Sequence, residues 1–427
     1  MLILCLALLV VMLLIGSPVA YAIGLPLTVI ILLTTDVPLK VVPQMMTAAV
    51  NSFPLMAIPF FMLAGALMNT AGITRRLFEF ANCLVGHITG GLGHVNVAAS
   101  MLFAGMSGSA VADAAGLGTV EIEAMTKQGY DVDFSAGITA ASATIGPIIP
   151  PSIIFVIYGV LAEVSIGALF LAGFIPGILM GLALMVRIYI IARKRDYPVH
   201  PRATFREIFT SFKAAFLPLL TPVIIIGGIM AGIFTPTEAA VVAVFYAFIL
   251  GAFVYRELSI KSLWRTIHTV AIQTAAIMMI TATANVLGWV LTRSRIPQLV
   301  AENMLMVTTD PHLILLFLNL FLLLNGCFME VIAALIILTP IIVPILKTVG
   351  IDPVHFGVVM TLNLMIGLLT PPMGMGLYAV QKVAGISFER IVRSAFPFLL
   401  PLIIVLVFVT YFPKLSLFLP NLLLATK

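Results

Sequence analysis

Apolar residues along the chain form long runs separated by short loops, and most of the charged residues lie in those loops. A helix needs about 20 predominantly apolar residues to cross a bilayer, and many of the runs reach that length. Because lipid offers no hydrogen-bond partners, a chain of this kind must satisfy its backbone internally. The pattern therefore predicts an all-α polytopic membrane protein of roughly ten or more membrane segments, with no soluble domain between them.

Composition supports this class. Of 427 residues, 62% are hydrophobic and 9% are charged, and the mean hydropathy is +1.20, whereas soluble domains carry about 25% charged residues. The first run, "MLILCLALLVVMLLIGSPVAYAIG", resembles a signal peptide but lacks a positively charged start and leads into a second run, so we expect two retained helices. Cys5, Cys83 and Cys327 have no metal-type spacing and are expected to be packing residues.

The placement of the basic residues predicts the orientation of the chain. The loop "RIYIIARKRDYPVHPRATFREIFTSFK" carries seven of them and is cytoplasmic by the positive-inside rule. Counting helices outward from this loop puts 16 of the 22 Lys and Arg residues on the cytoplasmic side and six outside, with both termini outside. The formal charge of +5 therefore indicates membrane orientation and not nucleic-acid binding.

Two helix-breaking segments interrupt apolar runs far apart in the sequence. "ATIGPIIPPSI" contains Pro150-Pro151, and "GLLTPPMGMG" contains Pro371-Pro372, at an offset of 221 positions (371 against 150). The same offset aligns Gly105 with Gly326 and Pro176 with Pro397, and the helix count makes the two copies opposite in orientation. An inverted pair of interrupted segments is typical of secondary transporters. The alternative is that each cluster is only a kink in a helix.

A second irregularity precedes each interruption. Two apolar flanks at about 90–129 surround a polar tip at Gly105 to Ala110, and two more at about 311–350 surround Asn325-Gly326. We expect two re-entrant helical hairpins, each with its tip against the broken helix that follows, at about 133–162 and 353–384. Non-helical backbone at membrane depth is tolerated only inside protein or beside a polar cavity.

The interruptions supply groups for both a cation and an anion. Freed carbonyls, such as those of Gly146, Ile149, Gly367 and Thr370, can replace the water shell of sodium, and the hydroxyls of Ser107, Ser109 and Thr370 can complete it. Helix starts near Ser152 and Met373 present N–H groups that favour a carboxylate. Only Asp113 and Glu330 are ionisable near these places, and no histidine is, which favours sodium over a proton relay. Either carboxylate could instead be a hydrogen-bonded structural group.

Two other functions remain open at this point. "GMSG" at Gly105 to Gly108 matches a pattern of intramembrane serine proteases, but all six histidines fall near helix ends or in loops, so a base for Ser107 is missing. A channel would show no saturable, coupled accumulation. We therefore predict a transporter and no enzyme activity.

The order and spacing of "GMSGSAVADAAGLGTVEIEAM", "GITAASATIGPIIPPSI" and "LLTPPMGMGLYAVQKVAGIS" resemble the large membrane subunit of tripartite ATP-independent periplasmic (TRAP) transporters, over essentially the whole chain. The resemblance implies an elevator-type carrier. It implies scaffold helices in 1–72, a first repeat in 73–190, a connector and central scaffold in 191–268, and a second repeat in 269–427.

The resemblance also implies the roles of individual residues. Sodium would bind where the hairpin tips meet the broken helices, at Ser107, Gly108, Gly146, Ile149, Pro150, Asn325, Gly326, Gly367, Thr370 and Pro371. The substrate carboxylate is expected at Ser109, Asp113, Ser152, Glu330, Met373 and Gly374.

Partners follow from the same resemblance. The family implies a bacterial inner-membrane permease that works with a small four-helix membrane subunit and a periplasmic binding protein. Because this chain begins with its first large-subunit helix, the small subunit is expected to be a separate chain. The cargo would be an organic acid, such as a four-carbon dicarboxylate or a sialic acid, coupled to sodium. A stand-alone sodium/dicarboxylate symporter is the alternative.

Overall fold

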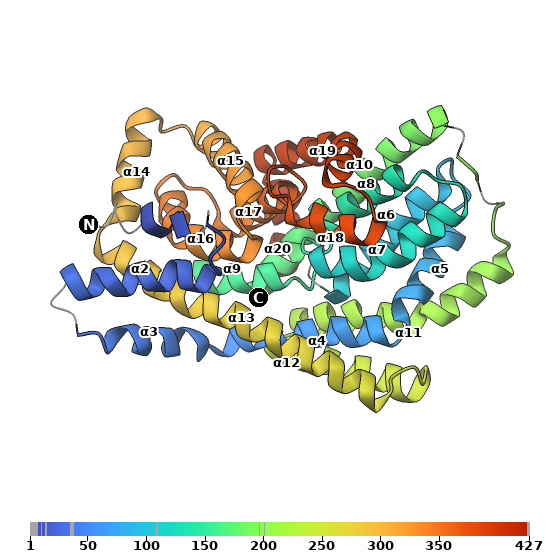
Figure 1. Cartoon of the computed structure of the whole chain (residues 1–427), viewed down its shortest axis with the longest axis horizontal. Coiled ribbons are helices and arrows are strands. Elements are labelled where there is room, and N and C mark those ends of the chain that lie inside the picture. The colour runs from blue at the N-terminus through green and yellow to red at the C-terminus, as the bar shows by residue number, and fades with distance from the viewer. Residues whose placement is uncertain are drawn as a thin grey trace.

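The structure is a computed structural model that describes residues 7–9, 11–12, 15–34, 38–107, 110–195, 197–199 and 201–424. Over these residues it contains helices and no strands (Figure 1). Eight of the described helical segments are long and apolar enough to cross a membrane. The prediction of an all-α polytopic membrane protein is therefore confirmed.

The helices of the N-terminal half follow the apolar runs. They are α2 (Val19–Thr34), α3 (Val41–Val50), the short η1 (Phe53–Met56), α4 (Ala57–Thr70), α5 (Ile73–Val85), α6 (Gly91–Ser107), α7 (Ala110–Lys127), α8 (Val132–Ala143), α9 (Ile153–Ala162) and α10 (Ile166–Arg195). The first expected N-terminal helix falls mostly outside the described residues, and the second is α2.

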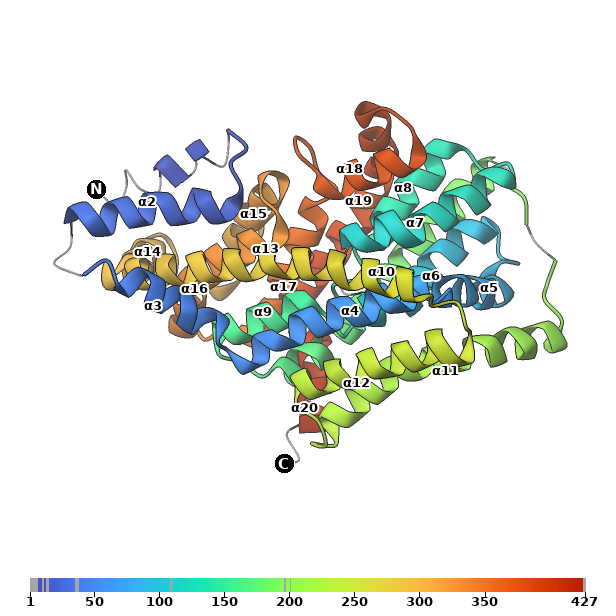
Figure 2. The ribbon, with the colours of Figure 1, turned by 60° about the horizontal axis from the view of Figure 1, so that its bottom comes forward.

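The remaining helices include the longest one in the chain. They are α11 (Phe205–Met230), α12 (Pro236–Ile249), the π-helical η2 (Leu250–Val254), α13 (Ile260–Arg293), α14 (Ile296–Val307), α15 (Pro311–Phe328), α16 (Val331–Thr348), α17 (Pro353–Gly367), α18 (Met375–Ala384), α19 (Phe388–Tyr411) and α20 (Lys414–Leu424). Helix α13 spans 34 residues and packs against α2, α3, α4 and α16. Figure 2 shows α4 and α13 running along each other.

Both Pro-Pro segments separate two helices. Helix α8 ends at Ala143 and α9 begins at Ile153, while α17 ends at Gly367 and α18 begins at Met375. In each gap proline removes a backbone donor and fixes φ, so the α-helical bonding pattern cannot continue. Both Pro-Pro peptide bonds are cis.

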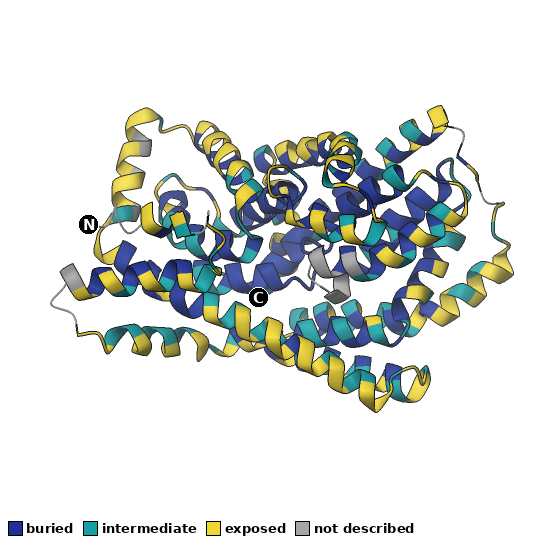
Figure 3. Ribbon diagram, in the orientation of Figure 1, coloured by how far each residue is buried: buried dark blue, intermediate teal, exposed yellow. Residues whose placement is uncertain are grey.

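Burial is highest in the middle of the molecule (Figure 3). All residues of α17 from His355 to Gly367 are buried, as are all those from Phe134 through Ile154. Large apolar side chains are exposed on α11, α12 and α13, where lipid would cover them. The first interruption is therefore buried, whereas residues 371–373 of the second are exposed although the preceding helix α17 is buried.

Two helix ends differ from the sequence expectation. Asn325-Gly326 was expected at a hairpin tip, but α15 continues to Phe328 because the Asn325 carbonyl accepts the Met329 N–H at 3.0 Å. The turn falls at Met329 and Glu330. Helix α18 was expected to begin near Met373 and begins at Met375 instead, after Gly374 in a left-handed conformation with φ of 51°.

Candidate functional site

Two helix pairs and two interrupted helices pack together at the centre. The first pair is α6 and α7, and the second pair is α15 and α16. Helix α7 packs against both α8 and α18, and α16 packs against both α9 and α17. The returning helix of each pair therefore contacts halves of both interrupted helices, which ties segments about 220 residues apart into one unit (Figure 1).

The first interruption leaves a row of carbonyls without donors. Within the described chain, no N–H or hydroxyl donates to the carbonyls of residues 146–151. The segment packs closely on α10, where a Cβ added at Gly173 would overlap the Ile148 carbonyl and one at Gly177 would overlap the Ile149 side chain. Buried carbonyls without partners are rare, so this segment fits the binding of a cation.

The Asp113 carboxylate lies against the first interruption. Asp113 is in the first turn of α7 and is 4% exposed. A Cβ added at Gly146 would overlap its Oδ2 atom. Only glycine at this position lets the carboxylate approach the interrupted backbone so closely, and the contact brings a negative charge beside the carbonyls.

Ser152 is the N-cap residue of α9. Its hydroxyl caps α9 by accepting the Phe155 N–H at 3.2 Å, and the residue is fully buried. An N-cap satisfies one of the orphan N–H groups of the first turn. This bond takes up one acceptor position of the hydroxyl that was expected to face a carboxylate.

The second interruption contacts the second helix pair backbone to backbone. A Cβ added at Gly326 would lie 3.0 Å from the Gly367 Cα, and one added at Gly367 would lie 2.5 Å from the Gly326 Cα. The Met373 N–H donates to the Cys327 carbonyl at 3.3 Å. This bond uses the N–H that was expected to attract an anion.

Thr370 links the two sides of the same contact. Its hydroxyl donates to the Gly367 carbonyl at 2.8 Å and lies 2.9 Å from Cys327 Sγ. The Gly367 carbonyl also accepts the Thr370 N–H at 3.0 Å, so it is more fully bonded than the carbonyls of the first interruption. The Thr370 carbonyl accepts no bond from the described residues.

Asn325 presents an unsatisfied oxygen next to this contact. Its Oδ1 atom is buried and has no hydrogen-bond partner among the described residues. An orphaned amide oxygen beside freed carbonyls is a suitable donor set for a hard cation such as sodium. Pro371 and Met373 are exposed, whereas Gly374 is buried.

Glu330 caps α16 and faces two cavities. Its carboxylate accepts the Ala333 N–H at 2.9 Å. A cavity of about 80 Å³ next to it is lined by both helix pairs and both interruptions, at Ala110, Pro147, Glu330, Leu368 and Met375 among others. The two interruptions and the two pair tips therefore meet at one place.

A much larger cavity adjoins the small one. It has a volume of about 990 Å³ and lies between the helix pairs, which contribute Asp113 and Glu330, and the long helices α4 and α13. The two cavities share Met62, Ile277, Glu330 and Ile332. A ligand in the large cavity would thus lie next to the point where the interruptions meet.

Comparisons with known proteins decide the family. The family model for the tripartite ATP-independent periplasmic transporter, DctM component, matches residues 6–415. This chain belongs to that family. It is a TRAP large permease, as the sequence motifs predicted, and therefore a membrane transport component.

Individual relatives cover nearly the whole permease. It is 50% identical over 409 residues to the sialic acid TRAP transporter large permease protein SiaM of Vibrio cholerae, with 96% of each chain covered. It is 45% identical over 369 residues to the C4-dicarboxylate TRAP transporter large permease protein DctM of Pseudomonas aeruginosa, with 86% of each chain covered.

A solved structure shares the fold of the permease. The YdaH transporter of Alcanivorax borkumensis aligns with a TM-score of 0.64 at 14% identity, over 90% of this chain and 91% of that one. At this identity the likeness supports the transporter fold and nothing about the cargo.

Three of the expected site residues lie wholly or partly outside the described part of the permease. Gly108 and Ser109 are not described, and for Ser107 only the backbone position at the end of α6 is. Their expected roles in binding sodium or substrate stay predictions.

Sequence reasoning missed two buried polar networks that connect the helices around the site. In the first, the Asn96 amide donates to Glu121 and to Thr139, both at 2.7 Å, and accepts from the Ser142 hydroxyl at 2.6 Å. In the second, Asn363 donates to Asn319 at 2.6 Å, and Asn319 donates to Thr410 at 3.1 Å. Polar residues in the middle of apolar runs were the available signal.

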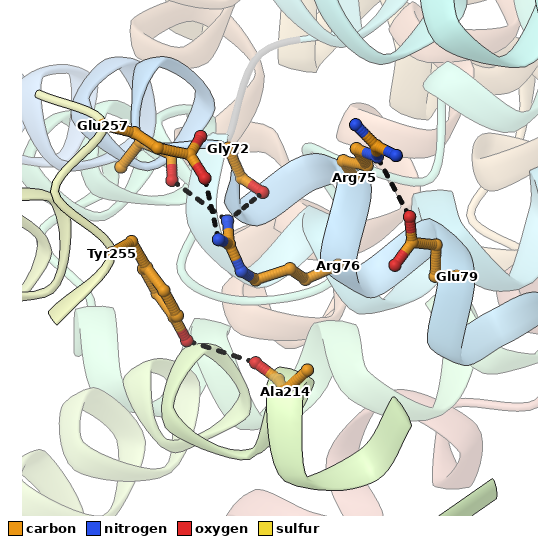
Figure 4. Close-up of polar contacts among 8 residues, drawn as sticks. Gly72, Arg75, Arg76, Glu79, Ala214, Tyr255 and Glu257 are labelled. Carbon is orange, nitrogen blue, oxygen red and sulfur yellow. Dashed lines mark hydrogen bonds and ion pairs between the residues drawn. The ribbon is translucent and has the colours of Figure 1, made fainter. Parts of the chain in front are cut away.

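A polar cluster outside the site joins α5 to the segment before α13 (Figure 4). The Arg76 guanidinium bonds Glu257 at 2.7 Å and the Gly72 carbonyl at 2.8 Å, and lies 3.9 Å from the centre of the Tyr255 ring. The Tyr255 hydroxyl donates to the Ala214 carbonyl of α11 at 3.1 Å. Burial raises the pKa of Tyr255, and the nearby Arg76 charge opposes this rise.

Arg76→Gln is expected to destabilise the permease by about 1–2 kcal/mol, because an ion pair, a cation–π contact and bonds to carbonyls are lost together. The measurement is the temperature at which half of the detergent-solubilised protein remains monodisperse after heating. Arg75→Gln is the matched control, since the Arg75 side chain is 80% exposed and pairs only with Glu79 one turn away. Equal midpoints for the two variants would contradict the role of Arg76.

Proposed function

We propose that this permease imports an organic acid across the bacterial inner membrane together with sodium. The observation that supports it best is the meeting of the two interruptions and the two helix pairs around one small cavity. The acid would arrive from a periplasmic binding protein, and a separate small membrane subunit would complete the transporter.

Sodium is supported by the oxygens that the interruptions leave without donors. The carbonyls of residues 146–151 serve the first site, and Asn325 Oδ1 with the Thr370 carbonyl serves the second. Unwound backbone carbonyls are the usual sodium ligands in transporters with interrupted helices. Among the described residues no group of three or more His, Cys, Asp or Glu side chains is placed to hold a metal ion, so a monovalent ion held by backbone oxygens fits better.

An elevator movement is supported by the way the helices pack. The helix pairs and the interrupted helices contact each other in a crossed arrangement. Helices α4 and α13 pack on the outside of this unit, at α6, α9 and α16, and also form one wall of the large cavity. In the proposed cycle the central unit carries sodium and the acid past these long helices. Both pair tips move with their cargo, so the ligands need not rearrange.

The carboxylate class of the cargo is supported by the relatives. One large permease at 50% identity is named for sialic acid and another at 45% for C4-dicarboxylates. Both compounds carry a carboxylate, and this common group is the one that the proposed site would bind. A cavity of about 990 Å³ holds either one.

The test is uptake by proteoliposomes that contain the permease and its small subunit. Sialic acid or a four-carbon dicarboxylate, each labelled and loaded on its binding protein, is added outside under an inward sodium gradient. We expect accumulation that requires both the binding protein and sodium. Uptake that is unaffected by replacing sodium with choline would refute the coupling. Uptake of the free acid without any binding protein would favour the stand-alone symporter.

A further inference from the structure

One wall of the large cavity is a polar stripe on α13. Ser262, Arg265, Thr269 and Gln273 recur every three or four residues and therefore lie on one face of the helix, and all four line the cavity. Towards the small cavity the lining of α13 becomes apolar, beginning with Ala276 and Ile277. The polar face thus covers the half of the cavity that lies away from the interruptions.

The facing wall on α4 is polar at the same level. Asn69 and Thr70 line the cavity there. The Thr70 and Thr266 hydroxyls lie 3.3 Å apart and fix the level at which α4 and α13 face each other. Amide and hydroxyl groups therefore line both sides of this half of the cavity.

Charge is distributed unevenly along the cavity. Lys261 and Arg265 lie at the end formed by the start of α13, and Asp113 and Glu330 lie at the end formed by the helix pairs. Neither Lys261 nor Arg265 makes an ion pair within the described chain. A carboxylate in the cavity is therefore repelled from the end that carries Asp113 and Glu330 and attracted to the end at the start of α13.

We propose that this stripe is the release path for a carboxylate that carries several hydroxyl groups, with Arg265 holding the carboxylate and Thr269 and Gln273 bonding the hydroxyls. Guanidinium groups bind carboxylates with directed, charge-assisted hydrogen bonds. Hydroxyls need partners that both donate and accept, which amide and threonine side chains supply. The proposal rests on the proposed function, since it needs a carboxylate cargo, and on the charge count that places the start of α13 in the cytoplasm.

The stripe favours a hydroxylated acid over a simple dicarboxylate. A four-carbon dicarboxylate would leave Thr269 and Gln273 of α13 without a bond to the cargo and would bring its second charge towards Asp113 and Glu330. The Thr70 hydroxyl and the Asn69 amide oxygen of α4 already bond the Ala66 carbonyl and the Thr74 hydroxyl. A volume of about 990 Å³ also accommodates an acid much larger than four carbons.

The test measures binding from the inside of the vesicle. Proteoliposomes with the permease and its small subunit are preloaded with unlabelled N-acetylneuraminate or succinate at a range of concentrations. Uptake of labelled N-acetylneuraminate from its binding protein is then followed. The measured quantity is the internal concentration of unlabelled acid at which the stimulation of this uptake is half of its maximum. Arg206→Gln on α11 is the matched control, because Arg206 is exposed on the predicted cytoplasmic side and does not line the cavity.

We expect Arg265→Gln to raise the half-maximal internal concentration of N-acetylneuraminate about tenfold, the effect of losing one charge-assisted contact, and Gln273→Ala to raise it severalfold. The sodium dependence of uptake should not change in either. The release path would be overturned if Arg265→Gln left the half-maximal internal concentration of N-acetylneuraminate unchanged. It would also be overturned if internal succinate stimulated uptake by the unsubstituted permease as effectively as N-acetylneuraminate does. Failure of the unsubstituted permease to show sodium-driven uptake would instead refute the proposed function.

Discussion

Gly367→Ala is expected to abolish sodium-driven uptake, with a loss on the order of 100-fold or more. A displacement of about 1 Å of the groups that form a site is enough for a loss of this size. The added Cβ would lie 2.5 Å from the Gly326 Cα and 2.6 Å from its carbonyl carbon. Both are backbone atoms, which cannot rotate away. The second helix pair must therefore separate from the second interruption, and Asn325 and Thr370 move apart with it.

The measurement is initial uptake in proteoliposomes at saturating sodium and at a series of lower concentrations. Gly227→Ala is the matched control, because Gly227 also lies inside a helix and has no neighbouring atom within 4 Å of an added Cβ. Yield and monodispersity of both variants show whether the fold survives. If Gly367→Ala were folded and retained normal sodium affinity, the contact between Gly326 and Gly367 would have no part in sodium binding.

Gly146→Ala is expected to reduce uptake about tenfold or more by displacing the Asp113 carboxylate from the first interruption. The added Cβ overlaps Asp113 Oδ2 and moves the carboxylate away from the proposed sodium ion at the carbonyls of residues 146–151. Loss of one charge-assisted contact with the ion would cost a factor of about this size. Asp113→Asn removes the charge without the overlap. If both act through the same contact, the double variant should be no worse than the more severe single one.

The measurement is sodium-dependent uptake by the unsubstituted permease, the two single variants and the double variant. The sodium concentration that gives half-maximal uptake is the second readout. Gly181→Ala is the control, because its added Cβ also meets a flexible side chain, that of Met101, away from the site. Fully additive losses in the double variant would show that Gly146 and Asp113 act separately. A loss in Gly181→Ala as large as in Gly146→Ala would point to general destabilisation.

The class of the protein and the positions of its interruptions could be predicted because both depend on local properties. Apolar runs of sufficient length specify membrane helices in any context. Proline removes a donor and restricts φ wherever it occurs, so α8 and α17 end close to the Pro-Pro pairs. The family motifs are equally local, and the family match bears them out.

Helix ends at the second interruption could not be predicted to the residue. Gly326 was expected at a hairpin tip, because two apolar flanks surround Asn325-Gly326. It lies inside α15 because the packing of Gly367 against it requires a residue without a side chain. A helix was expected to start near Met373 and starts two residues later, at Met375. The Met373 N–H is bonded instead to the Cys327 carbonyl, which is 46 residues away in sequence (373 against 327). In both cases a tertiary contact overrides local preference.

The sequence by itself determined that this protein is a membrane-embedded TRAP permease with two interrupted helices, since hydrophobicity, proline chemistry and motif spacing act over a few residues. Only the tertiary structure decided which atoms meet: Gly326 with Gly367, Asp113 with Gly146, and the polar face of α13 with the large cavity. These contacts join residues far apart in the chain, and close packing of whole helices fixes their geometry.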